Sequence, residues 1–167
     1  MVTQYHNPVL LEASIEGLNI IPNGTYVDVT FGGGGHSKAI LNFLDVGGRL
    51  LGFDQDTDAF KNALVDSRFD FIHSNFSNLS QYLKYHKAIP VEGILADFGV
   101  SSHQFNTRER GFSTRLNARL DMRMNQSQSL DAFEIINNYS EKDLRTLFYA
   151  YGELKNSKAI AIKIIDR

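Results

Sequence analysis

The sequence has no cysteine among its 167 residues. Disulfide bonds, cysteine-ligated zinc sites and cysteine nucleophiles are therefore excluded for this chain. It also lacks any apolar run near the roughly 20 residues that a membrane-spanning helix needs. Its first residues lack the basic start and apolar stretch that are typical of a signal peptide. We therefore expect a soluble, cytoplasmic protein with no membrane contact.

A large excess of either charge is absent as well. Lys and Arg number 17 and Asp and Glu number 19, which gives a net charge of −2. The chain is therefore not a generally basic nucleic-acid coat, and any contact with RNA or DNA must come from a local patch. Apolar residues make up 43% and charged residues 22%, a composition typical of a globular protein that is long enough to bury a core.

Strand and helix patterns alternate through the first hundred residues. Runs typical of buried strands lie at 25–30, 49–54, 69–73 and 91–97. Helical patterns lie at 36–44, 56–65 and 78–86, and Asn7 as N-cap with Pro8 as first helical residue predicts an earlier helix to about Leu18. Helices of this length between strands imply right-handed βαβ units and a parallel sheet. The sequence therefore predicts an α/β, Rossmann-like fold of strand order 3-2-1-4, with a ligand at the carboxyl ends beside the first strand.

The pattern changes to polar and then helical in the second part of the chain. Helical patterns lie at 130–139 with Ser129 as cap, from Ser140 to near Gly152 with a capping box, and from about Ser157 onward. We expect a ligand-binding core over 1–104 and a helical region over 105–167. Because the last helix reaches residue 167 without a C-cap signal, we expect an N-terminal fragment in which later strands of the sheet are missing.

Four consecutive glycines, 32–35, follow the first predicted strand and precede a helix that begins at His36. Glycine lets the backbone turn sharply and approach a ligand closely, and a helix N-terminus adds N–H donors. Asp54 comes 20 residues after Gly34 at the end of the second strand, where a carboxylate accepts hydrogen bonds from ribose hydroxyls. The alternative is a tight turn with Asp54 as a helix cap. The acidic residue at this offset favours a nucleoside-containing cofactor.

The identity of that cofactor depends on the glycine spacing. The dinucleotide fingerprint requires Gly or Ala where this sequence has Ser37, so an NAD-dependent oxidoreductase is the less favoured alternative. S-adenosylmethionine (AdoMet) offers a ribose without a pyrophosphate and relaxes that requirement. His36 would meet it through its ring or its backbone N–H, and no second side chain at ligand spacing makes His36 a metal ligand.

Three further residues are candidates for the same crevice. Asp97, at the end of the fourth strand, would face the reactive end of the cofactor or the nucleophile, or would only cap a loop. Phe76, after the third strand, would pack on adenine or belong to the core. Gln104 would hydrogen-bond a ligand or remain an exposed loop residue. These alternatives stay open on the residues alone.

Five arginines and two acidic residues lie in the polar segment 101–128. The arginines are Arg108, Arg110, Arg115, Arg119 and Arg123. Positive charge together with Phe112 suits contact with a single-stranded nucleic acid, and a solvated charged loop is the alternative. Because the segment directly follows the predicted site strand, we favour the nucleic-acid contact.

Seven segments resemble the MraW/RsmH family of ribosomal RNA small-subunit methyltransferases. They are HNPVLLEA at 6–13, DVTFGGGGHS at 28–37, GFDQD at 52–56, SNFSNL at 74–79, ILADFGVSSHQF at 94–105, RGFS at 110–113 and LDMRM at 120–124. The resemblance implies an AdoMet-dependent methyltransferase fold with a helical domain inserted after the fourth strand. It also implies methylation of N4 of a cytidine in the 16S ribosomal RNA of the small subunit.

The resemblance implies which residues contact the cofactor: Gly34, Gly35, His36, Asp54, Phe76, Asp97 and Gln104. For methyl transfer to the cytidine amine, Asp97, or the loop at 99–102, is by its position the candidate for holding the cytidine. This chain departs from the family in having only glycine where an Arg is often found in the loop, and Ala-Asp-Phe at 96–98 where Leu-Asp-Leu is common. It is also shorter, so an inactive nucleotide-binding fragment is a further alternative. An exposed fourth strand would favour self-association, for example as a homodimer.

Overall fold

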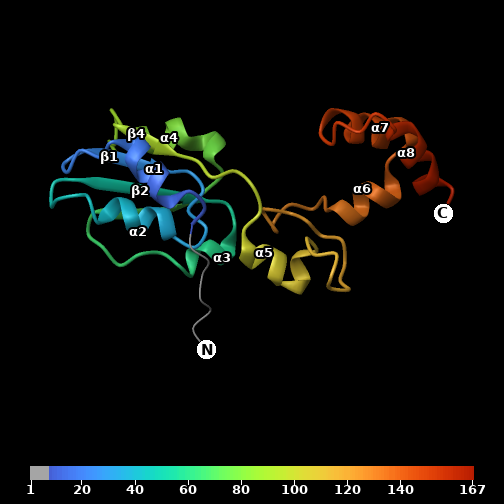
Figure 1. Cartoon of the computed structure of the whole chain (residues 1–167), viewed down its shortest axis with the longest axis horizontal. Helices are drawn as coiled ribbons and strands as arrows, with labels where there is room; N and C mark the ends of the chain where they lie inside the picture. Colours follow the sequence, from blue (N-terminus) through green and yellow to red (C-terminus); the bar gives the residue numbers. More distant parts are fainter. Residues whose placement is uncertain (1–7) are drawn as a thin grey trace. The chain divides into compact units, whose positions relative to one another are not determined.

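Four parallel strands form the sheet in the first part of the protein, as seen in a computed structural model that describes residues 8–167 (Figure 1). The strands are β1 (Thr25–Asp28), β2 (Arg49–Asp54), β3 (Phe69–His73) and β4 (Gly93–Leu95). Their order is β3-β2-β1-β4, with Val27 opposite Leu51 on one side and Ile94 on the other. The predicted fold class and strand order are therefore confirmed.

Helices cover both faces of the sheet. Because side chains alternate along each strand, neighbouring residues point to opposite faces. Tyr26 and Leu50 face the helices α1 (Leu11–Leu18), α2 (Gly35–Leu41) and α3 (Thr57–Phe60), and they pack in a core with Ile40. Val27 and Leu51 face the opposite way, in a core with residues of α4 (Leu79–Tyr85), which follows the short helix η1 (Phe76–Asn78). Figure 1 shows α4 on the other side of the sheet from α2 and α3.

Three of the predicted helices are shorter than expected, and the one predicted over 36–44 ends at Leu41. The helix predicted to begin at Pro8 begins at Leu11, and its predicted cap, Asn7, lies outside the described residues. The helix predicted over 56–65 ends at Phe60. Leu64 still packs against the core, so the apolar spacing that predicted a longer helix is satisfied by burial without helical backbone.

The chain divides into two compact units, Met1–His103 and Gln104–Arg167, which are described separately. The helix α5 (Ser102–Asn106) crosses this boundary, and η2 (Arg108–Arg110), α6 (Ala132–Asn138), α7 (Glu141–Ala150) and α8 (Ser157–Ile165) follow. Leu144 of α7 and Ala161 of α8 are fully buried. Among the described residues, no helix combines the length and apolar character needed to cross a membrane.

The caps of the second unit are partly as predicted. Ser140 caps α7 by accepting a hydrogen bond from the N–H of Asp143 at 3.2 Å. The predicted cap at Ser129 is wrong, because Asp131 caps α6 by accepting from the N–H of Glu134 at 2.8 Å. A carboxylate next to the first turn competes successfully with a hydroxyl two residues earlier.

Candidate functional site

Asp54 ends β2 and holds the glycine loop in place. Its Oδ2 accepts a hydrogen bond from the N–H of Gly32 at 2.8 Å, and its Oδ1 accepts from the N–H of Asp56 at 2.9 Å. The helix-capping role belongs to Asp56, which accepts from the N–H of Asp58. Asn62 donates to the carbonyl of Gly32 at 3.1 Å. Both backbone groups of Gly32 are therefore fixed beside the carboxyl end of β2.

Two glycines of this loop, Gly34 and Gly35, are required by close contacts. Gly34 has a φ of +74°, and a Cβ there would lie 2.8 Å from the ring of Phe31. A Cβ on Gly35 would lie 2.3 Å from Cγ of Pro8. Phe31 itself packs against Phe69 with ring centroids 5.3 Å apart. The loop is thus a compact turn anchored on aromatic core residues, and Phe31 is an anchor that the sequence reasoning missed.

The residues after the glycines turn inward. His36 is buried, and its Nε2 donates to the carbonyl of Val9 at 3.1 Å. Ser37 donates its hydroxyl hydrogen to Oδ2 of the fully buried Asp28 at 2.8 Å. Of the two predicted modes for His36, the geometry therefore favours contact through the backbone N–H, because the ring binds the segment before α1.

Burial raises the pKa of two carboxyl groups at this edge of the sheet. Loss of solvent raises the pKa of Asp28 above 3.8, although hydrogen bonds from Ser37 and Thr30 act in the opposite direction. Burial likewise raises the pKa of Asp54, opposed by the N–H groups of Asp56 and Gly32. Both carboxylates are thus desolvated groups that are held by backbone and hydroxyl donors.

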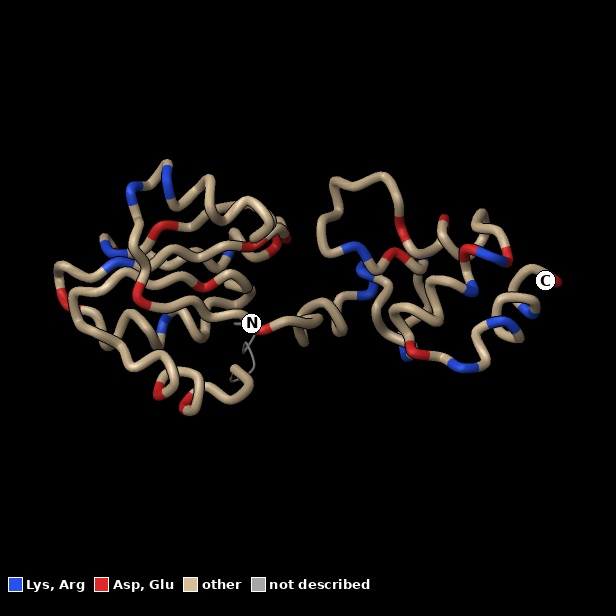
Figure 2. The backbone as a smooth tube through the Cα atoms, turned by 90° about the horizontal axis from the view of Figure 1, so that it is seen from above, with Lys and Arg blue, Asp and Glu red and all other residues tan. Residues whose placement is uncertain are grey.

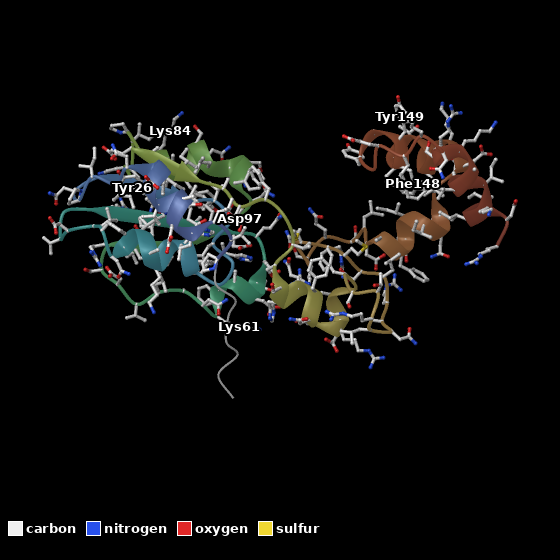
Figure 3. All side chains as sticks on the ribbon, in the orientation of Figure 1. Tyr26, Lys61, Lys84, Asp97, Phe148 and Tyr149 are labelled. Carbon is white, nitrogen blue, oxygen red and sulfur yellow. The ribbon has the colours of Figure 1, made fainter. Side chains whose placement is uncertain are left out.

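Asp97 lies on the loop that follows β4 and is exposed (Figure 3). Its N–H donates to Oγ1 of Thr30 at 2.7 Å. Thr30 in turn donates its backbone N–H to Oδ1 of Asp28 at 3.0 Å. The ends of β1 and β4 are thereby joined through one threonine hydroxyl. Thr30 was missed at the sequence level, although its position between the first strand and the glycines in DVTFGGGGHS was a usable signal.

Phe76 is not a core residue. It is 42% exposed at the start of η1, and its ring lies 5.6 Å from that of Phe98, which is 72% exposed. Two apolar rings therefore meet at the surface, one from the loop after β3 and the other from the loop after β4.

The predicted Gln104 belongs to the second unit. It is only 6% exposed, and its Nε2 lies 3.4 Å from Sδ of Met124. It is therefore not the exposed loop residue that was the alternative, and its contact with a cofactor stays a prediction.

Arg110 was among the arginines predicted to bind RNA, and for this residue the prediction is wrong. Its side chain is 1% exposed, and its guanidinium donates to the carbonyls of Arg123 at 2.9 Å and Met124 at 3.4 Å. Gly111 follows with a φ of +72°, and a Cβ there would lie 2.5 Å from the carbonyl oxygen of Arg119. Arg110 and Gly111 of the RGFS motif therefore stabilise the fold of the second unit. A buried guanidinium is not available to RNA.

Two more of these arginines pair with carboxylates of their own unit, in which acidic and basic residues are interspersed (Figure 2). Arg119 donates to Asp131 at 2.7 Å and to Glu134 at 3.0 Å, and Arg123 donates to Asp121 at 2.5 Å. These hydrogen bonds lower the pKa values of Asp131 and Asp121. The sequence did not predict the pairs of Arg119, because its partners lie 12 and 15 residues away.

The remaining two arginines, Arg108 and Arg115, are exposed. Arg108 donates through Nε to the carbonyl of Asn117 at 2.7 Å. Among the described residues, no group of three or more His, Asp or Glu side chains is arranged to hold a metal ion.

Comparison with known proteins places this arrangement in a family. The model of the MraW methylase family matches residues 3–167. The chain belongs to the MraW methylase family. Proteins named ribosomal RNA small subunit methyltransferase H are similar to it: that of Flavobacterium johnsoniae is 56% identical over 98% of this chain, and that of Christiangramia forsetii is 54% identical over 99%. That of Bacteroides fragilis is 55% identical over 98%.

The chain spans about half the length of these MraW-family relatives, between 54% and 55%. A solved structure, titled as a methyltransferase from an antibiotic biosynthesis pathway of Anabaena variabilis, aligns with 64% of this chain. The alignment covers 39% of the length of that protein, at 21% identity and a TM-score of 0.43. That likeness is too low to bear on the function. Membership of a methylase family disfavours the NAD-dependent oxidoreductase alternative.

Proposed function

We propose that the complete protein transfers a methyl group from AdoMet to N4 of a cytidine in the 16S ribosomal RNA of the small subunit, in the cytoplasm. The observation that carries this proposal is the family match over residues 3–167 together with the bond between Asp54 and Gly32. That bond brings the acidic residue and the glycine loop, which are 22 residues apart, to one point at the carboxyl edge of the sheet. The relatives are named ribosomal RNA small subunit methyltransferase H, which supports ribosomal RNA of the small subunit as the substrate.

The residues at this edge fit AdoMet. Each carboxylate oxygen of Asp54 accepts one backbone hydrogen bond and keeps further acceptor capacity for the ribose hydroxyls. The side chain is only half-buried, so those hydroxyls can reach it. Gly34 and Gly35 would bring the backbone close to the amino-acid part of the cofactor, and Phe76 offers an exposed ring to the adenine.

When bound, AdoMet supplies a methyl group that is activated by its sulfonium. Asp97 is assigned to the incoming cytidine, because its exposed carboxylate can accept a hydrogen bond from the exocyclic amine and stabilise the positive charge that develops there. Thr30 fixes the backbone of Asp97 and so limits the positions that this carboxylate can take at the carboxyl edge of the sheet. The cytidine must leave its stack to reach this position.

RNA contact in this proposal uses the exposed arginines of the second unit. Arg108 and Arg115 are exposed and are assigned to the phosphate backbone. Arg119 and Arg123 are bound to carboxylates, and Arg110 is buried. We therefore expect Arg115→Ala to weaken RNA binding and Arg110→Ala to destabilise the fold.

The first test is titration of the 167-residue chain with AdoMet and, separately, with NAD. We expect heat from AdoMet and none from NAD, and binding of NAD alone would overturn the proposal. In the full-length protein, Asp97→Ala should abolish transfer of labelled methyl groups to small-subunit ribosomal RNA. Near-normal turnover would remove Asp97 from the mechanism, and transfer by the full-length protein but not by the 167-residue chain would make this chain an inactive nucleotide-binding fragment.

Self-association of the 167-residue chain is a separate part of the proposal. Among the described residues β4 pairs with β1 on one side and ends the sheet order, and Ile94 is 48% exposed. An edge strand with an exposed apolar residue favours pairing with a second copy. Sedimentation should therefore detect dimers, and a single monomeric species at high concentration would contradict this.

A further inference from the structure

The contact between Phe76 and Phe98 joins loops that leave the two outermost strands of the sheet. β3 and β4 are separated by β2 and β1, so their ends lie about 14 Å apart at the usual interstrand spacing. The rings nevertheless lie 5.6 Å apart, inclined at 55°. The two loops therefore converge across the carboxyl ends of β1 and β2, where the glycine loop and Asp54 lie.

Phe98 is held in a defined place within its loop. The preceding residue, Asp97, donates its N–H to Thr30. The following residue, Gly99, has a φ of +147°, a conformation that favours glycine, and a Cβ there would meet nothing within 4 Å. The chain thus fixes the start of the loop and turns at a glycine directly after the ring. Phe98 is left 72% exposed at the edge of the sheet.

The direction of the bound nucleoside follows from the residues already assigned. The glycine loop follows β1, and the ribose-binding Asp54 ends β2, so the cofactor would run from β1 toward β3. Its adenine would then lie on the β3 side of Asp54, beside Phe76. Phe98 touches Phe76, and the two exposed rings together offer more apolar surface to a planar base than either offers alone.

We propose that Phe98 is a second adenine-binding residue, and that it forms an aromatic wall with Phe76 for the base of AdoMet. This inference rests on the proposed function and extends it to a residue outside the set that the family resemblance assigns to the cofactor. Stacking of a base on an aromatic side chain is commonly worth about a tenfold or larger change in affinity when the ring is removed.

The test compares AdoMet binding by calorimetry for Phe98→Ala, Phe98→Leu and Phe76→Ala, in both the 167-residue chain and the full-length protein. We expect Phe98→Ala to weaken AdoMet binding about tenfold, and Phe98→Leu to weaken it less because an apolar side chain remains. Phe43→Ala is the matched control, because Phe43 is 56% exposed and lies beyond the other end of α2 from the glycine loop. It should bind AdoMet like the wild type.

A double variant tests the wall itself. If both rings contact the same base, the combined loss in Phe76→Ala/Phe98→Ala should differ from the product of the two single losses. Thermal unfolding of each variant serves as the stability readout, and a wild-type midpoint together with weak AdoMet binding supports the inference.

Two results would overturn the inference. The first is wild-type AdoMet affinity in Phe98→Ala, whether or not the unfolding temperature falls, and a raised KM for RNA in that case would assign Phe98 to the target base instead. The second concerns the wild type. Wild-type protein that binds no AdoMet would overturn the proposed function itself and this inference with it, which separates the two failures.

Discussion

The two units of the protein hold their buried carboxylates in opposite ways. In the first unit, Asp28 and Asp54 accept hydrogen bonds from backbone N–H and hydroxyl groups, and burial raises their pKa values. In the second unit, Asp121 and Asp131 accept hydrogen bonds from arginine side chains, which lower their pKa values. The same side chain is therefore a desolvated acceptor in one unit and half of an ion pair in the other.

This difference separates a binding arrangement from a structural one. A half-buried carboxylate such as Asp54, held by two N–H groups, keeps acceptor capacity for a ligand. A carboxylate that pairs with an arginine neutralises a charge that would otherwise attract RNA phosphates. The five arginines of segment 101–128 therefore overstate the positive charge available to a partner, because Arg119 and Arg123 are paired and Arg110 is buried.

The largest effect is expected at Asp54, a carboxylate of the first unit that is held by backbone N–H groups and is proposed to bind the ligand. Asp54→Ala removes both the ribose acceptor and the anchor of Gly32, so AdoMet affinity should fall about 100-fold, since hydrogen bonds to a charged group are worth about 1.5–3 kcal/mol each. Asp54→Asn retains one acceptor oxygen and should lose about tenfold. Calorimetry with AdoMet measures both, and a loss smaller than about threefold in the alanine variant would show that Asp54 does not bind the ribose.

The next largest effect tests whether Arg110 is structural. Arg110→Met removes a buried charged donor from two partly buried carbonyls, so the second unit should lose about 3 kcal/mol of stability. Hydrogen exchange should show faster exchange in α6, α7 and α8 with little change in β1 and β2. Arg115→Met, at an exposed position, is the control. Equal loss of protection in both units would show that Arg110 does not stabilise the second unit alone.

A smaller effect is expected at Thr30, the link between β1 and the loop of Asp97. Thr30→Val keeps the shape and removes the acceptor for the N–H of Asp97, so kcat for methyl transfer by the full-length protein should fall about tenfold through loss of orientation. Thr30→Ser keeps the hydroxyl and should restore most of the rate. If the valine and serine variants have equal kcat, the hydroxyl does not position Asp97.

The smallest effect is an opposite pH dependence of the contributions that Asp28 and Asp121 make to stability. Asp28 has a raised pKa in the folded state, so its contribution should be lost as pH rises from 3.8 through the raised pKa. Asp121 has a lowered pKa, so its contribution should be lost as pH falls below 3.8 through the lowered pKa. Because Asp58 and Asp66 of the first unit also have lowered pKa values, each contribution is measured by hydrogen exchange at several pH values as the difference between the wild type and Asp28→Asn or Asp121→Asn. Two differences that change in the same direction with pH would refute the contrast.

Local sequence patterns determined much of the first unit. The strands at 49–54 and 69–73 have the predicted bounds, and the order 3-2-1-4 followed from the alternation of strands and helices. The glycine loop and the offset of Asp54 were also readable, because both are short-range features of a βαβ unit. The helix at 57–60 was overestimated, since apolar spacing reports burial and does not require continuous helical backbone.

Tertiary structure alone decided the contacts between distant segments. The position of the loops after the strands decides two contacts: that of Phe76 with Phe98, and the bond from Asp97 to Thr30 across 67 residues. The position of the irregular segment at 111–131 decides the burial of Arg110. Periodicity and spacing describe neighbours along one element, whereas these contacts join side chains whose relative position is set by sheet order and packing. The sequence by itself determined the family and the candidate cofactor edge, and the fold decided which charged and aromatic groups remain available there.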